Sequence, residues 1–343
     1  MNISVVYACD EGFSEVFATS LYSLLSTNTQ NDIVTYLIAD QISEEHTRRL
    51  KEISDSFHQE LVIIPAPNIN NMTTVDVDCK QYSLSAFSRF FVGTLIPKEV
   101  DTVLYLDCDT LILDDLSELI NISKAHPATF SVVSDYRSFR YARNLGIQRT
   151  HLYFNSGVLV IKLDQYREKK YEELLLKYIS FLNGRLEFPD NDILCMVAEE
   201  DVQLLPIRYN LTSIFCACSY EELKRIRASE EILEEIEFET CKENPCIVHF
   251  TRCFLLAGRP WEQGFNGHPY SHIYDTFWNK AVSTQKKINY RQKSLLSVFA
   301  NIAPRGLVVR AAGVAHSVIK PNIHWFATRY CRKMNELLKN ELN

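Results

Sequence analysis

The chain has 343 residues, of which 46% are hydrophobic and 23% charged, and its net charge is −7. This composition predicts a folded globular protein and excludes extended disorder. The acidic balance argues against broad nucleic-acid binding, which needs a basic surface to displace counterions from phosphates, so we expect no nucleic-acid partner.

Strands and helices alternate in the amino-terminal part of the chain. The β-branched run Ile3–Ala8 predicts a strand, and apolar residues at helical spacing in Ser14–Thr27 predict a helix. A strand at Asp32–Ala39, a helix starting near Ser43 and a strand at Glu60–Ile64 are expected next. This alternation predicts an α/β fold with a parallel sheet covered on both faces.

The middle of the chain continues the alternation after a polar loop at Pro67–Cys79. A helix is expected at Ser83–Leu95, followed by a compact apolar strand at Thr102–Leu106. The later elements are predicted strands at Thr129–Val133 and Tyr153–Leu163 and predicted helices at Tyr166–Leu182 and Asn191–Glu199.

The carboxyl-terminal tail changes character at about Lys280. Basic residues lie there among Leu, Val, Phe and Trp: Lys286, Lys287, Arg291, Lys293, Arg305, Arg310, Lys320, Arg329, Arg332 and Lys333. Such a segment is either a solvated helical cap or a surface that lies on anionic lipid. We therefore expect a catalytic domain over residues 1–280 and a basic, aromatic, helical extension over 281–343.

Several features bear on the cellular compartment. Ten cysteines are scattered without a CxxC pair, which predicts reduced, mostly buried thiols. The start MNISVVYACDEG has no basic segment before an apolar run, so no signal peptide is expected. No apolar run reaches the ~20 residues of a membrane span. We expect a cytoplasmic protein, with attachment to the inner face of the membrane left open, as is the oligomeric state.

Two carboxylates follow the buried strand TVLYL, in the sequence Asp107-Cys108-Asp109. The carboxyl ends of strands are where open α/β sheets bind ligands, and paired carboxylates suit Mg²⁺ or Mn²⁺. His249 ends the apolar run CIVHF and offers a third ligand. An Asp-x-Asp pair is also common in turns, and a buried histidine is often structural, so each residue has a purely structural alternative.

Other polar residues occur at similar positions. Asp10 and Gly12 follow the first strand, and Asn155 lies between apolar strands. Asp190 introduces a helix, where an N-cap is the plain interpretation, and Gly258-Arg259 offers close backbone approach and a guanidinium suited to phosphate. The glycine-rich motifs of dinucleotide and P-loop sites are absent from the sequence.

The combination of motifs resembles glycosyltransferase family eight, retaining enzymes that include bacterial lipooligosaccharide galactosyltransferases and glycogenins. The matching segments occur in the family's order from about Ile3 to Trp261: VVYACDEGF, FSRF, VLYLDCDTLI, FNSGVLVIKL, FPDNDILC, VHF and RPW. The resemblance implies a GT-A-like nucleotide-diphospho-sugar transferase fold, with a mixed sheet, a Rossmann-like nucleotide-binding half and a helical carboxyl-terminal extension.

The resemblance also implies roles for the matching residues. It assigns the nucleotide of a UDP-sugar to Ala8, Cys9, Asp10, Gly12 and Phe13. It assigns Mn²⁺ to Asp107, Asp109 and His249, with Cys108 between the two acids. It assigns the donor sugar and diphosphate to Arg89, Asn155, Ser156, Asp190, Asn191, Gly258 and Arg259, with Arg89, Asp190 and Asn191 as the catalytic residues.

Two departures from the family pattern bear on mechanism. The stretch TRCFLLAGRPW is longer than the family's Gly-x-x-Lys-Pro-Trp and has Arg259 in place of lysine. Asn191 replaces a common glutamine, and either amide is a poor nucleophile. The resemblance therefore favours front-face internal return, in which the leaving phosphate and the acceptor hydroxyl share one face of the donor sugar.

The expected reaction is transfer of glucose or galactose from a UDP-sugar to a hydroxyl of a glycan or lipid-linked glycan acceptor, in cell-surface polysaccharide or lipopolysaccharide synthesis. One rival is a non-catalytic UDP-sugar-binding or scaffold protein of the same fold, since fold does not imply activity. A second rival, a hydrolase or nucleotidyltransferase, would need further carboxylates for a two-metal centre.

Overall fold

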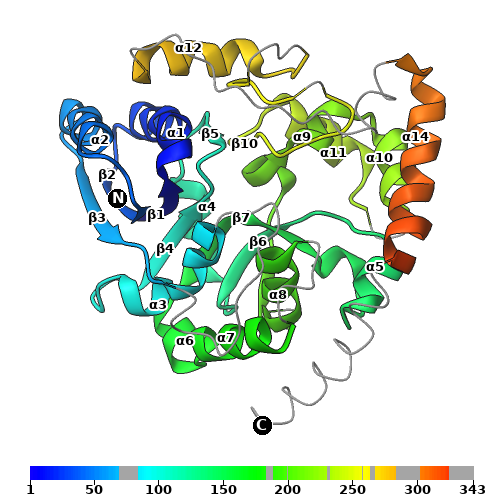
Figure 1. Cartoon of the computed structure of the whole chain (residues 1–343), viewed down its shortest axis with the longest axis horizontal. Coiled ribbons are helices and arrows are strands. Elements are labelled where there is room, and N and C mark those ends of the chain that lie inside the picture. The colour runs from blue at the N-terminus through cyan, green and yellow to red at the C-terminus, as the bar shows by residue number, and fades with distance from the viewer. Residues whose placement is uncertain are drawn as a thin grey trace.

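The computed structural model describes residues 1–68, 84–182, 188–198, 200–229, 232–256, 258–262, 267–282 and 302–323. A seven-stranded sheet in the order β3-β2-β1-β4-β7-β6-β8 forms its centre (Figure 1). The strands are β1 (Asn2–Asp10), β2 (Asp32–Asp40), β3 (Glu60–Pro65), β4 (Thr102–Leu106), β6 (Phe130–Ser134), β7 (Phe154–Lys162) and β8 (Val202–Leu204).

The sheet is mixed, as the resemblance implies. Strands β3, β2, β1 and β4 are parallel, which confirms the alternation argument for the amino-terminal half. That argument is wrong for β7, which runs antiparallel to both β4 and β6. Ser134 at the end of β6 pairs with Phe154 at the start of β7. The start of β7 therefore lies at the same sheet edge as the ends of β4 and β6.

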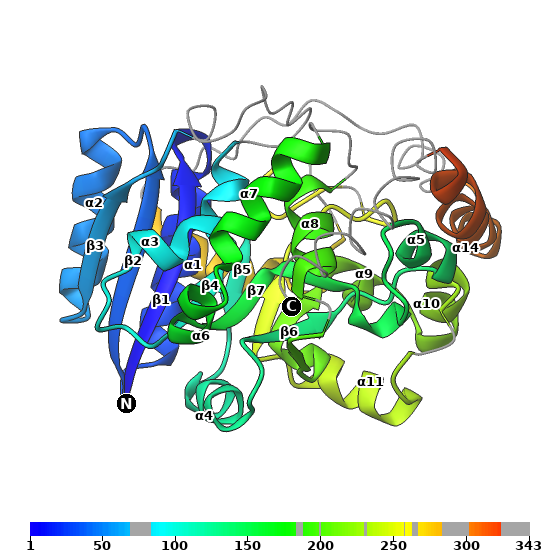
Figure 2. The ribbon, with the colours of Figure 1, turned by 90° about the horizontal axis from the view of Figure 1, so that it is seen from below.

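Both faces of the sheet are buried, because alternate residues of each strand point to opposite sides. Val5 and Tyr7 of β1 join one apolar cluster, and Val6 joins the other. The first cluster includes residues of α1 (Ser14–Thr27), α2 (Glu44–Ser56) and α12 (Ser271–Ala281). The second includes residues of η3 (Leu84–Phe91), α3 (Val92–Leu95), α6 (Leu163–Glu168), α7 (Tyr171–Leu182) and α8 (Pro189–Ala198), which Figure 2 shows from below.

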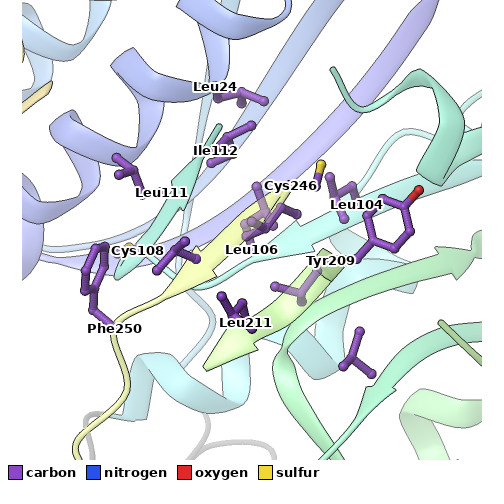
Figure 3. Packing of buried hydrophobic residues seen from close by; sticks show 14 of the residues in the cluster. Leu24, Leu104, Leu106, Cys108, Leu111, Ile112, Tyr209, Leu211, Cys246 and Phe250 are labelled. Carbon is purple, nitrogen blue, oxygen red and sulfur yellow. The ribbon is translucent and has the colours of Figure 1, made fainter. Parts of the chain in front are cut away.

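A three-stranded sheet, β5-β10-β9, packs beside the large one. Its strands are β5 (Thr110–Ile112), β10 (Ile247–His249) and β9 (Leu211–Thr212). Figure 3 shows Leu111 and Ile112 of β5 and Leu211 of β9 in one cluster with Leu24 of α1. Because β5 follows Asp109 directly and β10 ends at His249, this small sheet joins the two predicted parts of the metal site.

Several predicted elements differ in detail. The helix expected at Tyr166–Leu182 is two helices, α6 and α7, because Lys170 between them has a φ of 53°. Most of the helix expected at Ser83–Leu95 is the 3₁₀ helix η3, and Ser83 itself lies outside the described residues. The helix expected from Asn191 already begins at Pro189, and its expected last residue, Glu199, lies outside the described residues.

Other elements had no prediction. These are strands β5, β8 and β9, helices α4 (Ser117–Ala125), α5 (Phe139–Asn144), α9 (Ser213–Ala217), α10 (Tyr220–Arg227), α11 (Glu235–Glu243) and α12, and the short 3₁₀ turns η1 (Glu11–Phe13), η4 (Thr150–Leu152) and η5 (Ile207–Asn210).

The described part of the extension is a helix, α14 (Arg305–Val314), continued by the π-helical turn η6 (Ala315–Ile319). Arg305 donates two hydrogen bonds of 2.8 Å to Glu222 of α10. Gly313 allows close packing, because a Cβ there would lie 2.5 Å from the carbonyl oxygen of Arg225. Helix α14 thus packs on α10, and the two helices stand side by side in both ribbon views (Figures 1 and 2).

The structure describes only some of the residues behind the predictions for the cysteines, the basic tail and the polar loop. Among the described cysteines, seven are buried, Cys253 is half-buried and all are free thiols, as predicted. The predicted basic residues at 286–293 and 329–333 and most of the polar loop Pro67–Cys79 lie outside the described residues. Over the described part of the chain, no helix combines the length and apolar character needed to span a bilayer.

Candidate active site

Three potential metal ligands converge at the sheet edge. Asp107 and Asp109 leave the end of β4, and His249 ends β10, paired with Thr110 of β5. One ligand atom of each residue lies within 4.8 Å of the others. The Nε2 atom of His249 is 3.0 Å from Asp109 Oδ1 and 3.7 Å from Asp107 Oδ2. The three residues that the sequence predicts as ligands therefore form one cluster.

A chain of hydrogen bonds orients the His249 ring. The backbone N–H of Gly157 donates to Asn155 Oδ1 at 3.0 Å, so that oxygen is an acceptor. Asn210 donates its amide to the same oxygen at 3.0 Å, which turns Asn210 Oδ1 toward His249 Nδ1, also at 3.0 Å. Nδ1 must then carry a proton. Nε2 lies within hydrogen-bond distance of Asp109 Oδ1, at 3.0 Å, and in the neutral ring it is the unprotonated nitrogen, which is the form that binds a metal.

Gly157 provides the room for this cluster. A Cβ at that position would lie 2.2 Å from His249 Cε1 and 2.5 Å from Asp107 Oδ2, closer than real atoms approach. The Gly157 carbonyl also accepts from the Asp107 N–H at 2.8 Å. The start of β7 and the end of β4 are held together by this contact, and any larger residue would displace two of the three ligands.

Arg89 connects the aspartates to the start of β7. It is 5% exposed and donates to Asp107 Oδ1 at 2.9 Å and to the backbone and side-chain oxygens of Ser156 at 2.6 and 2.9 Å. It lies 3.4 Å from Asp190 Oδ2 and 4.7 Å from the centre of the Tyr105 ring. Burial lowers the pKa of Arg89, but the charges of Asp107 and Asp190 outweigh it and raise the pKa. The guanidinium is therefore a permanent buried cation.

The electrostatics of the cluster are those of an acidic site. Burial raises the pKa of Asp107, although Arg89 and His249 oppose the rise. Burial also acts to raise the pKa of Asp109, but His249 and Arg259 outweigh it and hold that pKa below its usual range. Burial lowers the pKa of His249, whereas Asp109 and Asp107 raise it to a greater extent. A divalent cation between these groups would relieve the repulsion between the carboxylates.

Asp190 and Asn191 come from the first turn of α8. Asp190 Oδ2 accepts from the Ser156 hydroxyl at 3.2 Å. Asn191 Oδ1 accepts from the Ser156 N–H at 2.7 Å, and its amide donates to the Phe154 carbonyl at 2.9 Å. Both ends of the Asn191 amide are thus bound to the backbone of β7. The predicted roles of these residues toward a donor sugar stay predictions.

The predicted nucleotide segment meets the Arg259 loop. Asp10 accepts from the Phe13 N–H at 3.2 Å and so begins η1, the turn that contains Gly12. The guanidinium of Arg259 lies 5.4 Å from the centre of the Phe13 ring and 4.6 Å from that of Trp261. Gly258 precedes it with a φ of 132°, a conformation that L side chains rarely adopt.

Arg259 also reaches the metal cluster. Its Nη1 donates to Asp109 Oδ2 at 3.2 Å, and its Nε donates to Glu262 at 3.2 Å. Nearby, the Cys108 thiol donates to the Ala8 carbonyl at 3.2 Å and so joins β1 to the Asp-x-Asp turn. The structure therefore brings the segments around Asp10, Asp107, His249 and Arg259 to one place.

Sequence reasoning missed several residues of the site. Asn210 and Gly157 support His249, Tyr105 donates to Asp107 at 3.3 Å, and Glu262 holds Arg259. The glycine in FNSG stands out in an apolar strand, where glycine often marks close approach of another group. Asn210 has no comparable local signal, because its partners Asn155 and His249 are far from it in the sequence.

The geometry agrees with comparisons to known proteins. Residues 4–263 match the family model described as glycosyl transferase family 8. The chain belongs to glycosyltransferase family 8. It is similar to general stress protein A of Bacillus subtilis (strain 168), with 27% identity over 274 residues, 79% of this chain and 91% of that relative. It is also similar to a lipopolysaccharide 1,2-glucosyltransferase of Escherichia coli, with 25% identity over 322 residues, 88% of this chain and 90% of the relative.

A solved structure has the same fold as this glycosyltransferase. A crystal structure of the galactosyltransferase LgtC with donor and acceptor sugar analogues superposes with a TM-score of 0.68 at 17% identity. The superposition covers 83% of this chain and 98% of LgtC. The predicted fold, a mixed GT-A-like sheet with a helical carboxyl-terminal region, is confirmed by this likeness. At such identity the likeness carries the fold and not the substrates.

Proposed function

We propose that this glycosyltransferase moves a hexose, glucose or galactose, from a UDP-sugar to a hydroxyl of a glycan acceptor with retention of configuration. The observation that supports this most is the convergence of His249 Nε2, Asp107 and Asp109, with Arg89 joining the same cluster to Asp190. A nucleotide-sugar donor needs a cation for its diphosphate and, close by, a group that holds its sugar. This cluster offers both.

The ligand set fits a divalent cation. Two carboxylates and one imidazole give a mixed oxygen and nitrogen set, which favours Mn²⁺ over Mg²⁺ because Mg²⁺ prefers oxygen alone. The cradle at Gly157 and the fixed ring of His249 hold these groups without help from other carboxylates. When bound, the metal would neutralise charge on the diphosphate as a Lewis acid.

The protein's own groups would act on the donor in distinct ways. Arg259 lies beside the Phe13 ring and Asp109, where its charge would stabilise negative charge that develops on the leaving UDP. Arg89 would hold Asp190 in place for the sugar hydroxyls. The Asn191 amide is bound at both ends and is a poor nucleophile, so we infer that the acceptor hydroxyl attacks the oxocarbenium-like donor directly.

The acceptor that we propose is a glycan or lipid-linked glycan of cell-surface polysaccharide or lipopolysaccharide synthesis, by analogy with the Escherichia coli relative. Contact with the inner face of a membrane belongs to the same proposal. It is supported by exposed apolar residues in the extension, such as Leu307, Val314 and Ile319, together with exposed Arg310.

The decisive experiment measures UDP release from UDP-glucose and UDP-galactose, each with Mn²⁺ and with chelator. We expect metal-dependent release from one donor, which would also name the sugar. Absence of both release and binding with every UDP-sugar would contradict the proposal. If a UDP-sugar bound but no UDP was released with any acceptor glycan, the result would favour the non-catalytic, scaffold alternative.

Asp109→Asn tests the metal assignment. The substitution removes one ligand charge and keeps the side-chain shape, so we expect at least a ~100-fold loss of transfer with the fold retained. Circular dichroism and Mn²⁺ binding by calorimetry accompany the assay. Full activity of the variant would show that Asp109 does not hold the metal.

A further inference from the structure

Three buried hydroxyl groups lie behind the two aspartates of the candidate metal site. They belong to Tyr7 of β1, Ser20 of α1 and Thr110, the first residue of β5. None of the three residues is more than 1% exposed. The hydroxyl oxygens of Tyr7 and Ser20 are 3.0 Å apart, and those of Ser20 and Thr110 are 3.1 Å apart. A continuous chain of hydroxyls therefore runs from the large sheet through α1 to the small sheet.

The chain ends on the four-residue turn Asp107–Thr110, the aspartate turn. The Thr110 hydroxyl donates to the Asp107 carbonyl at 2.8 Å, and the Thr110 N–H donates to the same oxygen at 3.2 Å. A bond from the fourth N–H to the first carbonyl is the one that closes such a turn. Because Asp107 and Asp109 both lie in this turn, its closure sets the direction in which their carboxylates leave the backbone.

The hydrogen bonds of the chain all run in one direction. Thr110 has a single hydroxyl proton, which goes to the Asp107 carbonyl, so its oxygen can only accept from Ser20. Ser20 has then used its own proton and must accept from Tyr7. Burial raises the pKa of Tyr7, so its hydroxyl keeps the proton that it donates. Hydroxyl dipoles aligned in this way polarise and strengthen one another.

Apolar side chains surround the chain. Tyr7 itself belongs to the buried cluster that contains Leu24 and Leu111, which Figure 3 draws at the junction of α1 and β5. The ring of Phe17 lies 4.8 Å from that of Tyr7, centre to centre. A hydroxyl buried among such groups cannot exchange a lost partner for water. The chain is therefore held in one arrangement.

The ends of the chain flank the predicted nucleotide segment. Tyr7 directly precedes Ala8, the first residue of that segment, and α1 begins at Ser14, directly after Phe13, the last one. The aspartate turn has other backbone contacts, from Asp107 to the Gly157 carbonyl and from Phe250 to the Asp109 carbonyl, but these lead to β7 and β10. The hydroxyl chain thus joins the aspartate turn to both flanks of residues 8–13.

We propose that the Tyr7–Ser20–Thr110 chain sets the position of the aspartate turn relative to the nucleotide segment, with Thr110 as its main positioning residue. The three side chains act through the Asp107 carbonyl and the flanks of residues 8–13, and not on the reacting atoms. This inference rests on the proposed function, because it takes Asp107 and Asp109 as metal ligands and residues 8–13 as the nucleotide segment.

Thr110→Val tests the positioning role in the full chain, because valine keeps the β-branched shape and removes the hydroxyl. Calorimetry should show about tenfold weaker Mn²⁺ binding, since a turn that is less well held must be ordered by the metal itself. The KM for the UDP-sugar should rise to a similar extent, while kcat at saturating Mn²⁺ and donor falls by less than about threefold, because both ligands then restore the turn. A purely structural role would move neither Mn²⁺ affinity nor KM.

Thr35→Val is the matched control. Thr35 is as buried as Thr110, and its hydroxyl has no hydrogen-bond partner within the part of the chain that the structure describes. The exchange of side chains is the same, so Mn²⁺ affinity should stay within about twofold of the wild type. A control that lost as much affinity as Thr110→Val would overturn the proposal, since the loss would then follow from any buried threonine.

Two further variants complete the test. Thr110→Ser restores the donor and should return Mn²⁺ affinity to within about threefold of the wild type. Ser20→Ala breaks the chain one step away from the turn and should weaken Mn²⁺ about threefold, a measurement that decides even if Thr110→Val does not fold. Wild-type affinity in both Thr110→Val and Ser20→Ala, or affinity in Thr110→Ser as low as in Thr110→Val, would overturn the proposal.

Failure of the proposed function gives a different result. If the wild-type protein bound neither Mn²⁺ nor UDP, the metal and nucleotide assignments would be contradicted, and the positioning role with them. If the wild type bound both and Thr110→Val bound them equally well, only the positioning role would be overturned.

Discussion

Two clusters of buried charge lie at one edge of the sheet, and they differ in how their charges are balanced. Around Asp107 and Asp109, carboxylates predominate and the imidazole of His249 turns its Nε2 toward them. Around Asp135, Arg137 and Arg227 both pair with that carboxylate, and Asp192 adds a second acidic group beside Arg137. Burying unmatched charge costs several kcal/mol per ion, so a fold keeps it where a ligand of the opposite sign offsets the cost. The acidic cluster therefore predicts a cation, whereas the cluster around Asp135 balances its own charges.

The comparison also separates function from stability. In the acidic cluster, removing a carboxylate should harm chemistry and not the fold. In the cluster around Asp135, removing that carboxylate should harm the fold first, because two cations then lose their shared partner. Four substitutions test this contrast, in order of expected effect.

Asp107→Asn should lower transfer by about a thousandfold or more, because it removes a metal ligand next to Arg89. Stability in chelator should not fall. Burial raises the pKa of Asp107, so its ionised form costs stability above the unfolded pKa, and a neutral amide avoids that cost. Urea unfolding in chelator and the transfer assay measure the two effects. If the variant were both unstable and inactive, Asp107 would support the fold as well as the chemistry, which would contradict this prediction.

Asp135→Asn should destabilise the protein by about 3–5 kcal/mol, since it removes the carboxylate that pairs with the buried Arg227 and with Arg137. Asp114→Asn is the matched control, because its partner Arg208 is near the surface and Asp114 is 54% exposed. Urea unfolding should show a loss below about 1 kcal/mol for that control. Equal losses in both variants would remove the distinction between buried and exposed pairs.

Asp192→Asn should change how stability depends on pH. Burial raises the pKa of Asp192 to about 7, and the hydroxyls of Tyr153 and Tyr141 only partly oppose it. The folded state then keeps this proton to higher pH than the unfolded state, so stability falls as pH rises from about 4 to about 7. We expect a fall of roughly 2–4 kcal/mol that the variant lacks, measured by urea unfolding at pH 5 and pH 8. Parallel curves for the two proteins would contradict the assignment.

Asn210→Ala should weaken Mn²⁺ binding by about 10–100-fold while leaving all three ligands in place. The cause is the lost acceptor for His249 Nδ1, which frees the ring to adopt the wrong tautomer. Asn244→Ala is the control, because the side-chain amide of this helix-end residue donates to the Thr240 carbonyl of its own helix. Calorimetry with Mn²⁺ decides, and unchanged affinity in the Asn210 variant would mean that the hydrogen-bond chain does not set the tautomer.

Much of the fold was predictable because it follows from local patterns. The strands around Ile3–Ala8 and Thr102–Leu106 are apolar runs with turn residues after them, and the structure has both. The small sheet was not predictable, since β9 has two residues and β5 has three, too few for a period of two to show. The break at Lys170 was missed because a lysine with positive φ leaves no compositional mark.

By itself the sequence determined the α/β alternation and the presence of an Asp-x-Asp pair at a strand end, because strand period and strand boundaries are local properties. Only the tertiary structure decided that Asn210 sets the tautomer of His249 and that Arg137 and Arg227 meet at Asp135. Those contacts join residues that lie far apart along the chain. Side-chain charge and hydrogen bonding act over a few ångströms of space, and the sequence does not record which distant residues come that close.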